Sequence, residues 1–408
     1  MILPSLPIEC FINIFFFLDR KSLYKCLFVS RFYCKLSIPR IWKNPFRPNC
    51  TLKSSSIINT LLACLNEDEI SYLIPCAINF NNQSPLFEYG RFVRKFDQSY
   101  FVDYIITWLE STNEPVDENY DCRIQKLIDV IYHTIMRQGS NLQELKLNYY
   151  FPIISHMNHF FPKALIFKTY KPGITNLRSI HINLNSDVQH QKAVEILNML
   201  PKFCNGIVDL NLRVVSIIDV QPFLDIIKSQ PLEKMVIRSY NGTKENINKI
   251  VCALEFRSET LKELVFWSLN FQEVDLSSIS RLECLEWLKF RQCEGFTYCH
   301  YEALSKKRLC FKELEFHTMS SNVIEALFNS LHSEALLKLT LSDITPKIAK
   351  AIKESCPRIG SLDITISSRS VQLLDSIIPL ICELSSLKFL CISISDEHAD
   401  ILESWVIV

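Results

Sequence analysis

Apolar side chains recur through the last two thirds of the chain in a short pattern whose first, fourth and sixth positions are apolar. The first position falls at Leu142, Leu177, Ile207, Leu232, Leu261, Leu285, Phe311, Leu336, Ile359 and Leu387, at intervals of 23 to 35 residues. Positions four and six lie on one side of a strand, because successive strand residues alternate faces. Ten occurrences, each followed by helix-like sequence, predict a repeated strand-and-helix unit over residues 141–408.

Residues 1–46 show a different, helical pattern. A first helix is predicted by apolar residues at helical spacing, which are Ile8, Phe11, Ile14, Phe15 and Leu18. Ser22 is expected to cap a second helix, and Arg31 to Leu36 to form a third before Ile38–Pro39 turns the chain. Ten of the 46 residues are aromatic. A unit this short cannot bury so much apolar surface, so we expect the excess to face a partner.

Residues 47–140 read as a helical connector. Apolar spacing near 3.6 residues predicts helices at Ile57–Leu65, Tyr100–Leu109 and Ile124–Met136. No catalytic cluster appears in this segment. We expect the connector to hold the first 46 residues at a fixed angle to the repeats.

Composition narrows the possible functions. The chain has 44 basic and 44 acidic residues among 408, so no global field recruits nucleic acid or a membrane surface. The seven glycines are at least 33 residues apart, which excludes a Walker P-loop, a dinucleotide fingerprint and a nucleophile elbow. The 16 cysteines form no Cys-x-x-Cys pair, and there is no long apolar run. We expect a cytoplasmic or nuclear protein without a metal, cofactor or membrane span.

Many residues of the first 46 agree in order with one known family. They are Leu6-Pro7-x-Glu9, Leu18, Ser22-Leu23, Cys26, Val29-Ser30-Arg31-Phe32-Tyr33, Leu36 and Pro39-x-x-Trp42. This segment resembles the F-box. The resemblance implies a three-helix unit that docks on the Skp-type linker subunit of a cullin ubiquitin ligase. It places the docking surface at Leu6, Pro7, Ile8, Ile14, Leu18, Leu23, Val29 and Trp42. Residues 1–46 contain seven basic and two acidic residues, a balance that suits an acidic partner. A helical hairpin packed on the next domain is the alternative.

The repeated pattern resembles the long, helix-containing class of leucine-rich repeat. The resemblance implies a solenoid with parallel strands on the concave face and helices on the convex face. The clearest intervening helices are expected to begin at Thr345–Pro346 and at Ser321–Asn322. Cys293 falls on the family's Asn/Cys ladder position, and we interpret it as a structural cysteine.

The remaining strand positions point to the concave face. The residue after each third apolar position forms a column of Asn148, Asn183, Arg213, Arg238, Trp267, Arg291, His317, Ser342, Thr365 and Ser393. Trp and Arg are frequent at interface hot spots. We therefore predict a target-binding patch, suited to an acidic or phosphorylated segment, at Arg213, Arg238, Trp267, Trp287, Lys289, Arg291 and His317. The alternative is a solvated stripe whose aromatic rings pack locally.

These features predict an α+β to α/β chain with an F-box at 1–46, a helical connector at 47–140 and about ten irregular leucine-rich repeats at 141–408. The leading hypothesis is a substrate-recognition adaptor of an SCF-type ubiquitin ligase that acts by proximity. The alternative is a protein-binding repeat scaffold without a ligase, which would need its own connector to cover the apolar head. An enzyme is not expected, because no convincing Ser/His/Asp grouping is present.

Overall fold

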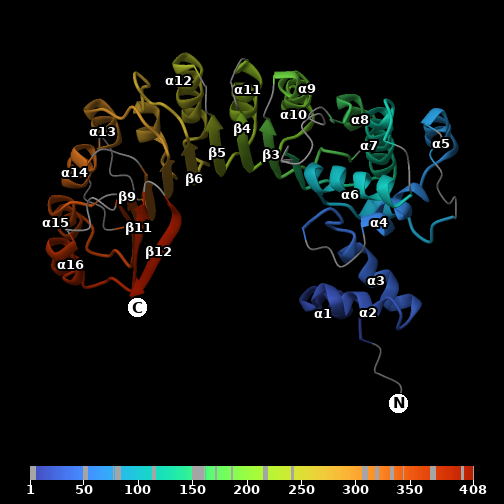
Figure 1. The fold of residues 1–408 in the computed structure, drawn as a ribbon, viewed down its shortest axis with the longest axis horizontal. Coiled ribbons are helices and arrows are strands. Elements are labelled where there is room, and N and C mark those ends of the chain that lie inside the picture. The colour runs from blue at the N-terminus through green and yellow to red at the C-terminus, as the bar shows by residue number, and fades with distance from the viewer. Residues whose placement is uncertain are drawn as a thin grey trace. The chain divides into compact units, whose positions relative to one another are not determined.

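Helices alternate with strands that pair in chain order in both units of the structure, Met1–Ile207 and Val208–Val408 (Figure 1). This computed structural model describes residues 6–48, 54–76, 78, 84–112, 116–148, 160, 162–170, 172–184, 187–214, 219–239, 243–305, 311–317, 321–330, 335–342, 344–367, 374–396 and 399–407.

The head of the first unit folds into three helices, α1 (Ile8–Phe17), α2 (Arg20–Cys26) and α3 (Arg31–Ile41). The prediction that Ser22 caps the second helix is wrong. Asp19 is the N-cap, and its carboxylate accepts a 2.8 Å hydrogen bond from the Ser22 backbone N–H. The third helix continues through the predicted turn and includes Pro39. Proline has no N–H to donate, and helical bonding resumes where Trp42 N–H reaches the Ile38 carbonyl at 3.0 Å.

Beyond the head, the first unit combines helices with three parallel strands. The strands β1 (Lys95–Asp97), β2 (Glu144–Asn148) and β3 (Ser179–Leu184) pair in that order. The helical segments are α4 (Ser54–Leu62), α5 (Glu67–Leu73), η1 (Ile74–Cys76), η2 (Tyr89–Phe92), α6 (Gln98–Ser111), α7 (Tyr120–Arg137), α8 (Ala164–Thr169), α9 (Asp187–Leu197) and α10 (Leu200–Phe203). The three helices predicted in the connector correspond to α4, α6 and α7.

The second unit is built on one sheet. Strands β4 (Asp209–Val214), β5 (Lys234–Ser239), β6 (Glu263–Trp267), β7 (Trp287–Arg291), β8 (Glu313–Phe316), β9 (Lys338–Ser342), β10 (Ser361–Ser367) and β11 (Phe389–Asp396) are parallel. The last strand, β12 (Ala399–Ile407), pairs antiparallel with β11. Helical segments connect the strands and lie along one face of the sheet (Figure 1): α11 (Gln221–Ser229), α12 (Lys244–Ala253), η3 (Leu254–Arg257), η4 (Ser277–Arg281), α13 (Tyr298–Ser305), α14 (Ser321–Ser330), α15 (Pro346–Ser355) and α16 (Leu374–Cys382). The opposite face is called the open face below.

The predicted repeat pattern matches the register of the strands. Position four falls on paired residues from β4 to β10, each 1% exposed or less: Leu210, Met235, Leu264, Leu288, Leu314, Leu339 and Leu362. At position six, the Phe290 ring stacks on Phe266 and Phe316, at 5.5 and 5.8 Å between centroids. The leucine-rich-repeat fold is confirmed. Thr345 also caps α15 as predicted, by accepting from the Ile348 N–H at 3.2 Å.

Two strands of the sheet, β1 and β12, were not predicted. β1 lies inside the connector and pairs parallel with β2. Its pattern begins with Val93 and Phe96, but the sixth position is Gln98, which is 1% exposed. The Gln98 side chain accepts from the Tyr132 hydroxyl at 2.6 Å and donates to the Phe160 carbonyl at 3.3 Å. These bonds satisfy a polar side chain where the other repeats have an apolar one.

No helix in the part of the chain that the structure describes is both long enough and apolar enough to cross a membrane.

Candidate functional site

The head presents a cluster of exposed apolar side chains. Five of the eight residues predicted to dock on a linker are exposed, and these are Leu6, Pro7, Ile8, Ile14 and Val29. Leu18 is half-buried. Leu23 and Trp42 are buried within this chain, at 6% and 4% exposure. A docking role for each of the eight stays a prediction, and the exposed five are the ones a partner could reach directly.

More of the head is exposed than the sequence analysis singled out. Phe17 and Phe28 are 84% and 83% exposed, and Ile12, Phe16 and Phe32 are also exposed. Their signal in the sequence was the aromatic excess of the first 46 residues. The head patch is defined here as Leu6, Ile8, Ile12, Ile14, Phe16, Phe17, Phe28, Val29 and Phe32. An apolar surface of this kind is typical of an interaction site.

Contacts between the helices hold the patch in place. The Phe11 ring lies edge-on to Phe32 and to Tyr33, with centroids 5.3 and 6.0 Å apart. Arg40, from α3, donates to the Phe15 carbonyl of α1 at 2.8 Å. This bond reaches a carbonyl in the last turn of α1, which also accepts a 3.4 Å bond from the Leu18 N–H. The first and third helices are therefore fixed against each other.

The head is joined to the first strands of its own unit by a series of backbone hydrogen bonds. A carbonyl that follows the first core position accepts two successive N–H groups, as the Arg94 carbonyl does from Gln143 and Glu144 at 2.8 and 3.0 Å. The Lys43 carbonyl accepts from Arg94 and Lys95 in the same way, at 2.9 and 3.0 Å. Lys43 follows Trp42, just as each accepting residue follows the first apolar position of its repeat. Trp42 thus occupies the first core position of the series, and its ring lies 4.7 Å from that of Tyr89.

The predicted column on the open face is formed. Arg213, Arg238, Trp267 and Arg291 are paired directly from β4 to β7. His317 follows Phe316, the partner of Phe290, and so extends the column; Ser342, Thr365 and Ser393 are likewise in register. In the first unit, Asn148 pairs with Asn183. Trp287 and Lys289 are half-buried in β7. That the column residues, Trp287 and Lys289 bind a target stays a prediction.

Carboxylates that the sequence analysis did not include lie among these cations. Glu315 is 8% exposed and accepts from Arg291 at 2.5 and 2.8 Å, and His317 is 2.9 Å from it. Glu313 lies 3.0 Å from Lys289 and from Lys338. Burial raises the pKa of Glu315, but hydrogen bonds from His317 and Arg291 outweigh this and lower it to about 2. The β7–β8 part of the predicted basic patch therefore carries its own counter-charge.

The Trp267 ring is held in a fixed place. Arg238 Cζ lies 4.0 Å from the ring centroid and Arg291 Cζ lies 5.5 Å from it. The indole N–H donates to the Gln292 side chain at 2.8 Å. Ser268 and Gln292, which follow Trp267 and Arg291, both have left-handed backbone conformations, with φ of +55° and +50°. Such conformations are costly for residues other than glycine and are often found at functional sites.

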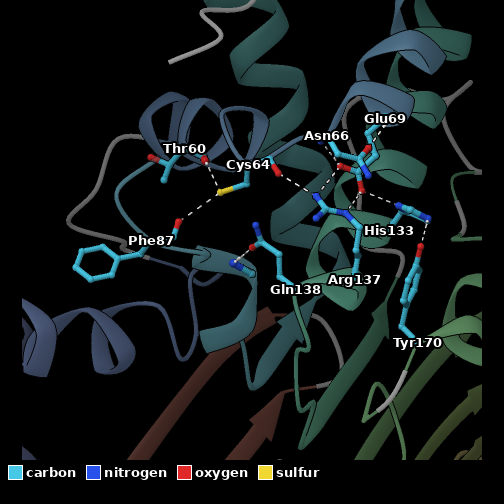
Figure 2. A network of polar contacts seen from close by, with 10 residues as sticks. Thr60, Cys64, Asn66, Glu69, Phe87, His133, Arg137, Gln138 and Tyr170 are labelled. Carbon is cyan, nitrogen blue, oxygen red and sulfur yellow. Dashed lines mark hydrogen bonds and ion pairs between the residues drawn. The ribbon is translucent and has the colours of Figure 1, made fainter. Parts of the chain in front are cut away.

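A buried cysteine of the second unit and a buried carboxylate of the first unit stabilise their own surroundings. Cys293 is buried, which raises the pKa of its thiol to about 12 and fits the structural interpretation. In the first unit, Figure 2 shows Glu69 accepting from Arg137 at 2.9 and 2.8 Å, next to His133 at 2.6 Å. Burial raises the pKa of Glu69, but the bonds from Arg137 and its other partners hold it below its usual value.

A cavity of about 250 Å³ lies beside this network, between α5, α7 and α8. Its lining residues pair with each other, since Lys163 lies 3.1 Å from Asp129 and His133 lies 2.6 Å from Glu69. We interpret the network as a structural tie between these helices. Within the described ranges, no group of three or more His, Cys, Asp or Glu is arranged to hold a metal ion.

Comparison with known proteins identifies the head. A family model described as F-box-like matches residues 3–48. No match was found among curated proteins.

Two solved structures are similar in part. The leucine-rich repeat-containing protein LegL7 from Legionella pneumophila is 11% identical, over 62% of this chain and 90% of that one, with a TM-score of 0.37. A chain of the Rad7 and Elc1 complex in yeast is 13% identical, over 90% of this chain and 94% of that one, also with a TM-score of 0.37. Because both TM-scores lie below 0.5, neither likeness says what this chain binds. The family match and the strand register together show that the chain carries an F-box-like domain at residues 3–48, followed by a leucine-rich-repeat fold.

Proposed function

We propose that this chain is the substrate-recognition adaptor of an SCF-type ubiquitin ligase. The F-box-like head docks on a Skp-type linker subunit, and the open face of the repeats captures a target protein. The chain itself catalyses no step. It raises the local concentration of the target near the subunit that transfers ubiquitin, so it speeds the reaction through proximity alone.

The observation that carries this proposal is the exposure of the head patch. Phe17 and Phe28 are more than four-fifths exposed, in a segment that matches the F-box-like family. Exposed apolar side chains grouped in one segment are typical of a surface that a partner covers. The alternative function, a repeat scaffold without a ligase, would require the connector to cover the patch. Among the described residues, the connector leaves these side chains exposed, which favours the adaptor.

Co-purification with a Skp-type linker tests the proposal. We expect the wild-type chain to form a stable complex, and the double variant Leu6→Ala/Pro7→Ala to lose it. Both side chains are exposed, so their removal should leave the melting temperature unchanged. Leu86→Ala is the matched control, because Leu86 is 78% exposed outside the head. A chain that stays monodisperse and captures no linker would support the repeat scaffold instead.

A further inference from the structure

The open face combines cations, carboxylates and the Trp267 ring in an arrangement that limits what it can bind. Directly paired residues from β4 to β7 supply Arg213, Arg238 and Arg291 around Trp267, and this column contains no acidic residue. Four residues earlier in the chain than members of this column, and on the same face, lie Asp209 in β4, Glu263 in β6 and Glu313 in β8. The column is therefore a basic stripe around one indole ring, and acidic residues lie on the same face, farther along the strands.

From this arrangement we propose that the Arg238–Trp267–Arg291 cluster is the centre of the target-binding surface and that it recognises a segment of protein rich in Asp and Glu. The proposal rests on the proposed function only in taking the open face as the side that captures the target.

The geometry of the cluster suits a carboxylate. The Arg238 guanidinium lies against the Trp267 ring at 4.0 Å, and a stacked guanidinium keeps its N–H donors around its edge. The indole N–H is already bonded to Gln292, so the ring keeps its position when a ligand arrives. A cluster fixed in advance loses less conformational entropy on binding.

The spacing of the column favours an acidic protein segment over a nucleic acid. Neighbouring strands are about 4.8 Å apart, and side chains two residues apart in an extended peptide are separated by about 7 Å. Two or three carboxylates can therefore lie along the stripe. A nucleic acid is wider and carries a continuous row of phosphates, which would meet Glu263 and Glu313 on the same face, four residues from the stripe.

Glu315 sets the strength of this interaction. It holds Arg291 through two hydrogen bonds and also contacts His317. A carboxylate of the target must therefore share the Arg291 guanidinium with Glu315, which already occupies it. Removing the charge of Glu315 should therefore strengthen binding, whereas removing the charge of Arg238 should weaken it.

Fluorescence anisotropy with labelled peptides and the full chain tests the proposal. We expect an oligoglutamate peptide to bind in low salt and an oligoserine peptide not to bind. Arg238→Gln should weaken binding about tenfold, the factor that loss of one charge-assisted hydrogen bond implies. Glu315→Gln should strengthen it. Lys350→Gln, which removes an exposed cation from α15, is the control and should leave it unchanged. Arg238→Lys, which keeps the charge without the planar fork, should bind with intermediate affinity.

Four results would overturn the proposal: no binding of oligoglutamate, equal weakening by Lys350→Gln, binding of a phosphoserine peptide alone, or displacement by a single-stranded oligonucleotide at lower concentration than by oligoglutamate. The assay requires no linker subunit. The Leu6→Ala/Pro7→Ala variant should bind oligoglutamate normally, so a failure of peptide binding is distinguishable from a failure of the adaptor function.

Discussion

Glu315 is a buried carboxylate hydrogen-bonded to Arg291 and His317, and its environment makes stability depend on pH. Its pKa is lowered from 4.5 to about 2 because the bonds from His317 and Arg291 outweigh the effect of burial. A carboxyl with a lower pKa in the folded chain stabilises the fold when it is ionised. This contribution is complete above the unfolded-state pKa and is lost as the pH falls toward the folded-state pKa.

We therefore expect the free energy of unfolding of the wild type to fall more steeply than that of Glu315→Gln between about pH 4.5 and 2. Urea denaturation followed by tryptophan fluorescence at several pH values measures this difference. Glu354→Gln, on the exposed surface of α15, should behave like the wild type. Parallel curves for the wild type and Glu315→Gln would contradict the prediction.

At the scale of single residues, the sequence located the column but missed its counter-charges. The signal was present, because Glu313 and Glu315 alternate with the buried Leu314 and Phe316 and so lie on the same face as His317. The pairing of Arg291 with Glu315 could not be predicted in the same way. It depends on which rotamers long side chains adopt across neighbouring strands.

At the scale of elements, strands with an apolar sixth position were predictable and β1 was not. Each predicted strand has apolar residues at all three core positions, and the paired residues stack from repeat to repeat. Gln98, which directly follows β1, breaks this pattern. Only the positions of Tyr132 and Phe160 explain how the hydrogen-bonding groups of its side chain are satisfied. These partners are distant in sequence, so no local pattern contains the information. The start of α2 was predicted three residues too late for a simpler reason: Asp19 and Ser22 are both good N-cap residues, and the pattern did not distinguish them.

The stacked rings at position six should make the second unit sensitive to truncation at its centre. Phe290 is fully buried between Phe266 and Phe316. We expect Phe290→Ala to destabilise the fold by about 3–5 kcal/mol, the usual cost of such a cavity. Phe256→Ala, at a side chain that is 54% exposed, is the matched control and should cost far less. Equal losses in chemical denaturation would show that the stacked rings are not a major source of stability.

At the scale of the whole molecule, exposure separates two roles within the predicted docking set. Leu6 and Pro7 can contact a partner, whereas Trp42 lies in the core beside Tyr89. The sequence could not make this distinction, because Trp42 satisfies the F-box pattern and the first position of the repeat series at once.

Trp42→Ala should therefore act on stability. We expect a loss of about 3–5 kcal/mol, as for other buried aromatic residues, with the folded fraction still able to capture a linker. Thermal unfolding combined with co-purification of a Skp-type linker measures both effects. Loss of the complex at an unchanged melting temperature would instead place Trp42 in the docking surface.

The hydrogen bonds that Lys43 accepts have a consequence for how the chain can be taken apart. A cut after residue 48 would remove the acceptor of Arg94 and Lys95 and leave β1 with an uncovered edge, which is prone to pair with other chains. A head taken from another protein would need an aromatic residue at the place of Trp42. It would also need a backbone carbonyl that points at Arg94 and Lys95 as that of Lys43 does. The F-box-like segment thus covers the β1 edge of the sheet in addition to the docking role proposed for it, so it is not an independent cassette.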